Sequence, residues 1–323
     1  MDSPGIESLA LPGSGPLVLA HGGAWDIPDL EVEAHRAGIE HALRVGARLV
    51  ERERAALEVA VEVAAVLESS GTFDAGRGAV LDLDGLPQLD AGVMDGQTRR
   101  WGAVANVRTL PNPIRAARAV LEADGQARLL VADGAERFAA EAGLPAVAVD
   151  ALIHDRERSR YHRLLEYRAA HPESARSGQM DVPRGTVGCV VRDLEGGLAA
   201  ATSTGGAPLT RPGRVGDSSI VGAGFFADPH AAASATGWGE AILTAGLAGR
   251  ACRLVADGLE VEDAARRCLS DLAEQVRWSG EDAATAGLLL ADAHGRAAWA
   301  FSTPRMARGI WRPGEEVALE VVR

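Results

Sequence analysis

The chain has no lysine, and its 33 basic residues are all arginine. A phosphate-binding P-loop and a Schiff base with pyridoxal phosphate both need a lysine side chain, so these classes are excluded. Acidic residues outnumber the basic ones, since 45 Asp and Glu give a formal charge of -12. A nucleic-acid-binding protein needs a basic surface that displaces counterions from phosphates. We therefore expect no nucleic-acid partner.

Cysteine and long apolar runs are also scarce. The three cysteines, Cys189, Cys252 and Cys268, show no C-x-x-C spacing, which predicts reduced structural thiols in a cytoplasmic protein. No run approaches the roughly 18 apolar residues that span a bilayer, and residues 1–16 carry no basic group before their apolar run. We expect neither a membrane segment nor a secretory signal.

The pattern of apolar residues predicts an α+β chain with a sizeable core, since 47% of the residues are hydrophobic. We expect one domain over residues 1–323, in which two stacked sheets lie between outer helical layers. Helices are predicted at 31–50, 53–69, 113–122, 132–142, 155–170, 239–258 and 261–278, and strands at 16–23, 102–107, 186–191, 198–204, 219–226, 231–236, 286–292 and 297–302, with a hairpin at 79–90.

A polar segment, 171–185, interrupts this pattern. It is rich in Ser, Gly and Pro and has no periodicity, which is typical of an exposed mobile linker where chains are cut. Thr186 follows at once and opens a predicted strand. If the bond before Thr186 is cut, the freed α-amine becomes a base for the threonine hydroxyl. Gly185 suits such a cut, because glycine tolerates strained backbone angles.

Seven short blocks occur along the chain in an informative order. They are His21-Gly-Gly-Ala24, Phe73-Asp-Ala-Gly-Arg-Gly78, Leu89-Asp-Ala-Gly-Val-Met-Asp-Gly96, Gly185-Thr-Val-Gly188, Ala201-Thr-Ser-Thr-Gly-Gly206, Pro212-Gly-Arg-Val-Gly-Asp-Ser218 and Thr236-Gly-Trp-Gly-Glu240. Together they resemble the signature blocks of plant-type L-asparaginases, also called isoaspartyl peptidases. The resemblance runs from about Leu17 to the C-terminus, and the first dozen residues and the linker have no counterpart.

The resemblance implies a fold and an activity. The fold would be the four-layer αββα sandwich of N-terminal-nucleophile hydrolases, cut between Gly185 and Thr186 into an α subunit (1–185) and a β subunit (186–323). The activity would be hydrolysis of β-aspartyl amide bonds, in L-asparagine and isoaspartyl dipeptides, through a covalent threonine ester. No cofactor would be required, and two αβ units would form a dimer.

The resemblance also implies roles around the nucleophile Thr186. Thr204 would orient its hydroxyl, while the hydroxyl of Thr236 and the N–H of Gly237 would stabilise the oxyanion. Taken alone, each of these threonines is more often an ordinary strand residue. Only the order of the blocks favours the catalytic interpretation.

Arg214, Asp217, Gly237 and Gly239 would bind the substrate. A guanidinium grips a carboxylate with two parallel hydrogen bonds and an aspartate pairs with an ammonium, so together they select an α-amino-acid head group. Without the resemblance, Arg214 and Asp217 would be interpreted as a surface ion pair in a Gly/Pro-rich loop.

Two positions depart from or vary within the family pattern. Asp74 stands where the family usually has Asn, which removes an amide donor and adds negative charge beside the nucleophile. Trp238 fills a variable position and hints at dipeptide substrates. The family's sodium loop of backbone carbonyls, which suit a hard cation, is matched here by Leu67, Glu68, Ser70, Phe73, Ala75 and Arg77.

Three other functions remain open at this point. A serine esterase could use the Ser of Gly216-Asp-Ser-Ser219, although Asp228-Pro-His230 has the wrong spacing and no Gly-x-Ser-x-Gly elbow is present. Glycosylasparaginase or a threonine protease would share the fold. A non-enzymatic protein could bind an amino acid through Arg214 and Asp217 without turnover.

Overall fold

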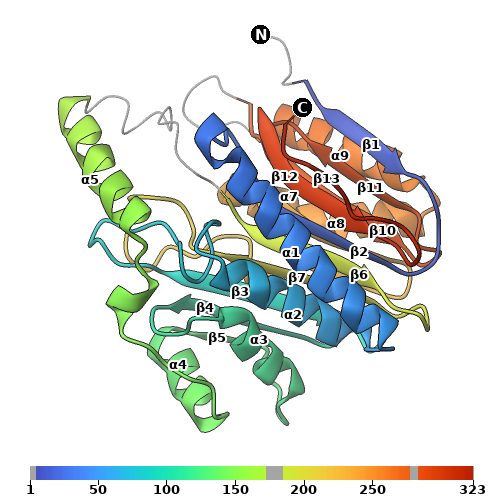
Figure 1. Cartoon of the computed structure of the whole chain (residues 1–323), viewed down its shortest axis with the longest axis horizontal. Helices are drawn as coiled ribbons and strands as arrows, with labels where there is room; N and C mark the ends of the chain where they lie inside the picture. Colours follow the sequence, from blue (N-terminus) through green and yellow to red (C-terminus); the bar gives the residue numbers. More distant parts are fainter. Residues whose placement is uncertain (1–4, 172–184, 277–282, 323) are drawn as a thin grey trace.

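A computed structural model describes residues 5–171, 185–276 and 283–322 of the chain. Two β-sheets are stacked face to face, and helices cover their outer faces (Figure 1). The predicted four-layer α+β arrangement is confirmed. The predicted linker lies outside the described residues, apart from His171 and Gly185 at its two ends.

The larger sheet is eight-stranded, and only its last pair, β4 and β5, is parallel. Strand β2 is buried along its whole length, because helices cover one face of the sheet and the second sheet covers the other. The strand order is β13 (Ala318–Glu320), β12 (Arg305–Trp311), β2 (Leu17–Trp25), β6 (Val187–Arg192), β7 (Leu198–Thr204), β3 (Leu89–Asp95), β4 (Trp101–Val107) and β5 (Leu129–Val131).

The smaller sheet is five-stranded and antiparallel. Its central strands contact β2, β6 and β7 of the larger sheet, so the middle of one sheet lies over the middle of the other. The strand order is β1 (Glu7–Leu11), β11 (Ala297–Phe301), β10 (Ala286–Asp292), β9 (Ala231–Gly237) and β8 (Phe225–Ala227).

The helices form the two outer layers. Helices α1 (Val32–Glu51), α2 (Ala56–Ser69) and α3 (Pro113–Glu122) pack on the larger sheet, while α8 (Leu247–Ala256) and α9 (Val261–Gln275) pack on the smaller one. Proline at the first position of α3 is tolerated, because no helical hydrogen bond needs its missing N–H. The remaining helical elements are η1 (Asp29–Glu31), α4 (Ala132–Glu141), η2 (Val149–Leu152), α5 (Asp155–Ala170) and α7 (Gly239–Ala245).

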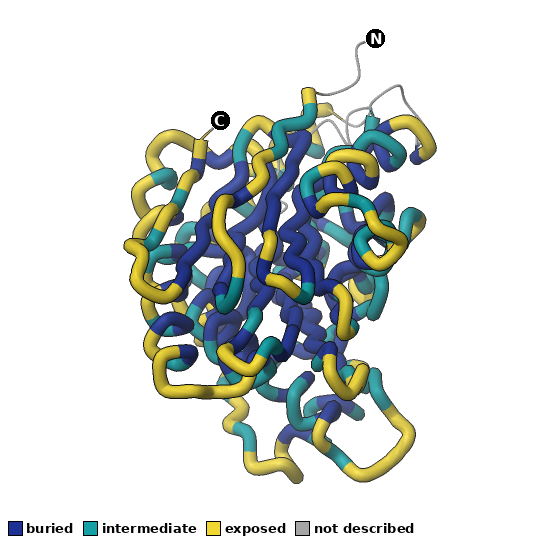
Figure 2. Tube along the Cα trace, turned by 90° about the vertical axis from the view of Figure 1, so that its right-hand side faces the viewer, coloured by how far each residue is buried: buried dark blue, intermediate teal, exposed yellow. Residues whose placement is uncertain are grey.

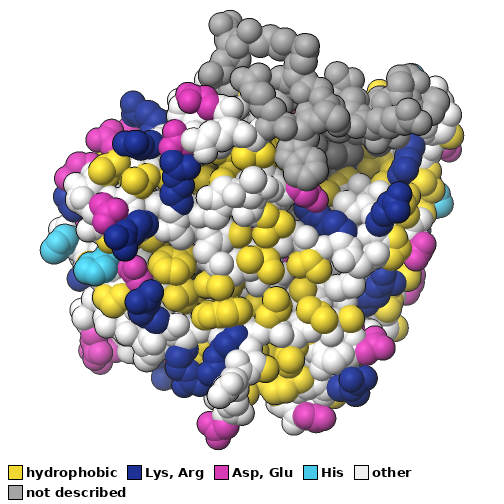
Figure 3. Space-filling view, turned by 180° about the vertical axis from the view of Figure 1, so that it is seen from behind, with side chains coloured by type: hydrophobic (Ala, Val, Ile, Leu, Met, Phe, Trp, Pro, Cys, Tyr) yellow, Lys and Arg dark blue, Asp and Glu magenta, His cyan; other side chains and the backbone are white. Residues whose placement is uncertain are grey.

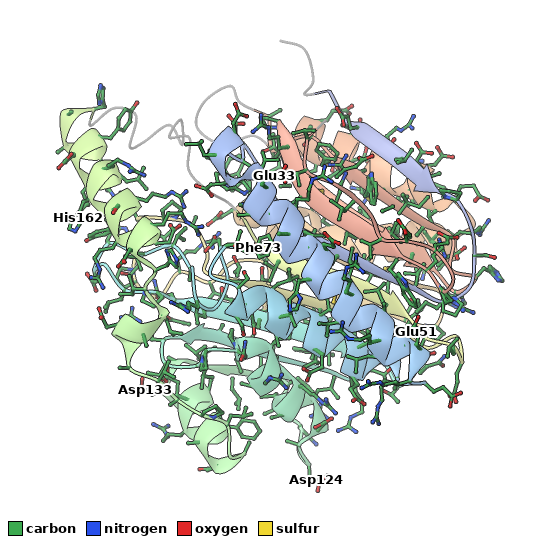
Figure 4. All side chains as sticks on the ribbon, in the orientation of Figure 1. Glu33, Glu51, Phe73, Asp124, Asp133 and His162 are labelled. Carbon is green, nitrogen blue, oxygen red and sulfur yellow. The ribbon has the colours of Figure 1, made fainter. Side chains whose placement is uncertain are left out.

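The hydrophobic core follows the layers. One cluster lies between α1, α2, α3 and the larger sheet, one lies between the two sheets, and one lies under α8 and α9. Figure 2 shows the strands as a buried centre surrounded by exposed loops. Phe73 is fully buried against α1 and β2, whereas His162 on α5 is exposed; both residues are labelled in Figure 4.

Three predicted elements differ from the structure. The hairpin at 79–90 is wrong, because Asp82 holds a turn by accepting the N–H groups of Asp84 and Leu86, and the strand begins only at Leu89. The strand predicted at 219–226 is replaced by the shorter strand β8 (Phe225–Ala227). The helix at 239–258 is two helices, since Gly246 between them adopts a left-handed φ of 58°.

Strands β1, β5, β12 and β13 were not predicted. Three of them are short or lie at a sheet edge, where apolar alternation is weak, and β12 lies between β2 and β13 with a shifted register after Met306. All three cysteines are buried and free, as expected. Within the described ranges, no helix combines the length and apolar character needed to cross a membrane.

Candidate active site

Thr186 lies directly before β6, near the middle of the larger sheet, and its side chain is buried. Its hydroxyl donates to Thr204 Oγ1 at 3.2 Å. The register of β6 and β7 pairs Val187 with Ser203, which brings the two threonines side by side. The N–H of Gly206 also donates to Thr204 Oγ1, at 3.0 Å. The strand pair therefore joins the two threonines that the sequence singled out.

His21, on β2, supports the main chain of Thr186. Its Nδ1 lies 2.9 Å from the Thr186 carbonyl oxygen, and its Nε2 lies 2.8 Å from Ser234 Oγ on β9. Because a carbonyl only accepts, Nδ1 carries the proton and Nε2 accepts from the Ser234 hydroxyl. Burial lowers the pKa of His21 to about 3, so the ring is neutral. Neither partner of His21 was predicted from the sequence.

Thr236 and Gly237 end β9 in the smaller sheet. The Thr236 hydroxyl is buried and accepts the N–H of Ala24 at 3.2 Å, so β2 contacts both the nucleophile strand and the predicted oxyanion donor. Gly237 has a φ of 132°, and a Cβ at this position would lie 2.6 Å from Ala286 Cα. A side chain at this position would collide with β10, so only glycine allows the backbone angle that orients the N–H of residue 237.

Gly185 and Asp74 are neighbours. A Cβ at Gly185 would lie 3.6 Å from Asp74 Cβ and 3.3 Å from Trp25 Nε1. Asp74 Oδ1 accepts the N–H of Val80 at 2.9 Å, whereas Oδ2 is buried without a partner among the described residues. Burial raises the pKa of Asp74 well above its ordinary value. This favours a neutral carboxyl, with an O–H donor, over the negative charge expected from the sequence.

Arg214 lies in the loop after β7, close to the start of α7. Its Nε and Nη2 donate to the two carboxylate oxygens of Glu240 at 3.0 and 3.1 Å. A Cβ at Gly239 would lie 2.6 Å from Arg214 Nη2 and 3.0 Å from Asp217 Oδ1. The structure thus brings Arg214, Asp217 and Gly239 together, as predicted. Glu240 ends the last of the seven sequence blocks, and its pairing with Arg214 was not predicted.

Asp217 belongs to the same loop and is buried, as is Asp90 of β3. Burial raises the pKa of Asp217 to about 7, although Arg214 opposes the shift, and burial raises the pKa of Asp90 to about 6. Asp90 accepts the N–H groups of Asn106 and Gly216 at 2.8 and 3.0 Å, whereas Asp217 Oδ2 has no partner among the described residues. We call this set the head-group region: Asp90, Arg214, Asp217, Gly239 and Glu240.

The predicted sodium loop begins in the last turn of α2, at Leu67. The carbonyls of Glu68 and Phe73 accept the N–H groups of Arg77 and Ala75, both at 2.9 Å. A Cβ at Gly78 would lie 2.7 Å from the Phe73 carbonyl oxygen and 2.8 Å from that of Gly71, so these oxygens face a space lined by glycine. Among the described residues no cluster of His, Cys, Asp or Glu could hold a metal. Any cation here would rely on backbone oxygens.

Comparison with known proteins shows which family the chain belongs to. The family model described as Asparaginase matches residues 14–319. The match includes both sheets almost entirely and all of the predicted site residues.

Curated relatives cover most of the chain. An isoaspartyl peptidase/L-asparaginase from Danio rerio is 38% identical over 93% of this chain and 93% of its own length. A plant-type L-asparaginase from Pyrobaculum calidifontis is 39% identical, over 92% of this chain and 97% of its own. An isoaspartyl peptidase from Salmonella typhimurium is 36% identical, over 95% and 98%. The chain is therefore an enzyme of the asparaginase family of amidohydrolases.

Proposed function

We propose that this enzyme hydrolyses the side-chain amide of L-asparagine and the β-aspartyl bond of isoaspartyl dipeptides, with Thr186 as its nucleophile. The observation that carries this proposal is the 3.2 Å contact between the hydroxyls of Thr186 and Thr204. It occurs at the first residue after the Gly185–Thr186 bond. The names of the relatives support the class of bond.

The nucleophile is prepared by self-cleavage. The Thr186 hydroxyl attacks the carbonyl carbon of Gly185, the C–N bond breaks, and the departing nitrogen takes up a proton. Water then hydrolyses the ester, which leaves a carboxylate on Gly185 and a free α-amine on Thr186. The products are the subunits 1–185 and 186–323.

Turnover repeats this chemistry on the substrate. The α-amine of Thr186, with a pKa of roughly 7.7–8.0 in model compounds, accepts the hydroxyl proton. The hydroxyl oxygen attacks the β-aspartyl carbonyl, and ammonia or an amino acid leaves with a proton. Water then releases aspartate from the ester. Thr236 and Gly237 supply donors for the oxyanion, and Arg214 and Asp217 hold the α-carboxylate and α-ammonium.

A comparison of wild type with Thr186→Ala and Thr186→Ser tests the proposal. Intact mass and a denaturing gel report cleavage, while ammonia from L-asparagine and leucine from β-Asp-Leu report turnover. We expect two fragments and both activities in the wild type, weaker cleavage in the serine variant, and neither in the alanine variant. Turnover by an uncut chain, or by the alanine variant, would refute the proposal. Aspartate binding without turnover would favour a binding protein.

We also propose that the loop after α2 binds a sodium ion through backbone carbonyls. The predicted ligands are the carbonyls of Leu67, Glu68, Ser70, Phe73, Ala75 and Arg77. The carbonyl oxygens of Glu68 and Phe73 would each lie 2.7 Å from a Cβ, at Gly76 and Gly78 respectively, and neutral oxygens suit a hard monovalent cation. Such an ion would fix Asp74 and the turn after Thr204, because the carbonyl of Asp74 accepts the N–H of Gly205 at 3.0 Å. Replacing sodium by lithium or choline should lower the melting temperature, and an unchanged melting temperature would contradict the site.

Finally, we propose that two αβ units form a dimer. The face opposite to that of Figure 1 carries a central area of hydrophobic side chains bordered by arginines and acidic residues (Figure 3). Such an area is typical of an association surface. Sedimentation or light scattering should give twice the chain mass at micromolar concentration, and a monomer at all concentrations would contradict this.

A further inference from the structure

The head-group region holds opposite charges that lie close together without pairing. Arg214 and Asp217 are three residues apart, and each shifts the titration of the other. No ion pair joins them among the described residues. Arg214 instead pairs with Glu240, and Asp217 Oδ2 stays buried without a partner. This arrangement calls for an explanation, because a buried carboxylate normally pairs with the nearest guanidinium.

The Arg214–Glu240 contact uses one edge of the guanidinium. Nε and Nη2 donate to Oε1 and Oε2 at 3.0 and 3.1 Å, which is a two-pronged ion pair. A guanidinium has five N–H donors, so both hydrogens of Nη1 and one of Nη2 remain. Glu240 is the only hydrogen-bond partner of this guanidinium among the described residues. The edge formed by Nη1 and Nη2 is therefore available.

Glycines surround that available edge. A Cβ at Gly216 would lie 2.7 Å from Nη1, and a Cβ at Gly206 would lie 3.5 Å from the same atom. Gly206 donates its N–H to Thr204 Oγ1, so Nη1 faces the turn that carries the nucleophile's partner. The missing side chains leave room for a carboxylate on this side of Arg214.

Without Glu240, Asp217 is the carboxylate that would form an ion pair with the Arg214 guanidinium. Both oxygens of Asp90 already accept backbone N–H groups, so Asp90 competes less for the guanidinium. Asp217 is only 4% exposed, and opposite charges attract strongly where water is excluded. If Arg214 and Asp217 formed an ion pair with each other, neither would be available to bind the carboxylate or the ammonium of a zwitterionic substrate.

We propose that Glu240 is a positioning residue that holds the Nε–Nη2 edge of Arg214 and so prevents Arg214 from pairing with Asp217. Arg214 then keeps its Nη1–Nη2 edge for the substrate's α-carboxylate, and Asp217 keeps an oxygen for the α-ammonium. This inference rests on the proposed function, in which both residues bind the amino-acid head group.

Kinetics of Glu240→Ala and Glu240→Gln on L-asparagine test the proposal. We expect the alanine variant to raise KM about tenfold or more, with kcat changed less than about threefold, because binding is impaired and the nucleophile is not. Glutamine keeps one acceptor and should give a smaller rise. Glu262→Ala, which removes an ion pair with Arg266 on helix α9 outside the head-group region, is the matched control and should match wild type.

A double-mutant cycle with Asp217→Asn separates this role from a merely structural one. Once Asp217 can no longer compete as a carboxylate, Glu240→Ala should have little further effect on KM. Additive losses, or an unchanged KM in Glu240→Ala, would overturn the proposal. Self-cleavage shows that each variant folds, and the glutamine variant carries the test if the alanine variant does not fold.

The outcomes also separate this proposal from the proposed function. If the wild type hydrolyses no β-aspartyl amide, the proposed function fails first. If Arg214→Ala raises KM while Glu240→Ala does not, the head-group assignment stands and only the role of Glu240 is wrong.

Discussion

The two halves of the candidate site are built in opposite ways. The nucleophile region consists of uncharged groups on strands or directly before one: His21, Thr186, Thr204 and Ser234. Each of these groups hydrogen-bonds another, and burial keeps His21 neutral. The head-group region consists mainly of charged groups on loops and at a helix start, and one of its carboxylate oxygens has no partner. The hydrogen bonds of the nucleophile region fix the position of Thr186, whereas the Asp217 oxygen of the head-group region, unpaired among the described residues, can bind a ligand.

This contrast predicts that head-group variants affect turnover alone. Arg214→Ala should lower kcat/KM for L-asparagine by about 100- to 1,000-fold, because a partly buried partner of the α-carboxylate is lost. Self-cleavage should proceed at the wild-type rate, since it involves no amino-acid head group. Arg211→Ala, an exposed arginine of the same loop, is the control for both assays. A strong loss of self-cleavage in Arg214→Ala would show that the two regions do not act independently.

Variants of the nucleophile region should affect both reactions. Thr204→Val removes the acceptor of the Thr186 hydroxyl and of the Gly206 N–H. Self-cleavage and turnover should each slow by about 10- to 100-fold, which corresponds to about 1.5–3 kcal/mol. Thr204→Ser should restore most of both rates. A slower turnover with normal self-cleavage would show that Thr204 acts in turnover alone.

Stability should respond to pH with opposite signs in the two regions. The pKa of Asp217 is raised to about 7 in the fold, so ionisation between about pH 4 and pH 7 destabilises the folded state. Asp217→Asn should therefore raise the free energy of unfolding at pH 8 by an amount on the order of 1–2 kcal/mol, with a higher melting temperature, and change both little at pH 4.

His21 provides the matched contrast. Its folded pKa of about 3 lies below the ordinary 6.5, so its contribution to stability is present above pH 6.5 and is lost as the pH falls towards 3. His21→Gln should destabilise the protein at pH 8 and differ less from wild type at pH 4. The same sign of pH dependence in both variants would contradict the division into two regions.

Much of the nucleophile region was predictable because it is local. Thr186 directly precedes β6 and Thr204 ends the adjacent strand β7; a short turn joins the two strands, and this pairing follows from apolar runs on either side of Gly196. The Thr236 block was placed by its resemblance to the family, and the structure adds that Gly237 has a φ of 132°, which other residues rarely adopt. Strand β12 was missed, although it pairs with β2, because its identity depends on a partner almost 300 residues away.

The sequence by itself determined which residues are available. It excluded lysine chemistry, supplied a threonine after a glycine, and placed the candidate residues in the order of a known family. The tertiary structure decided their state: a neutral His21 between Thr186 and Ser234, a raised pKa for Asp217, and Glu240 on Arg214. Protonation and pairing depend on burial and on contacts between distant segments, and these exist only once the two sheets pack together.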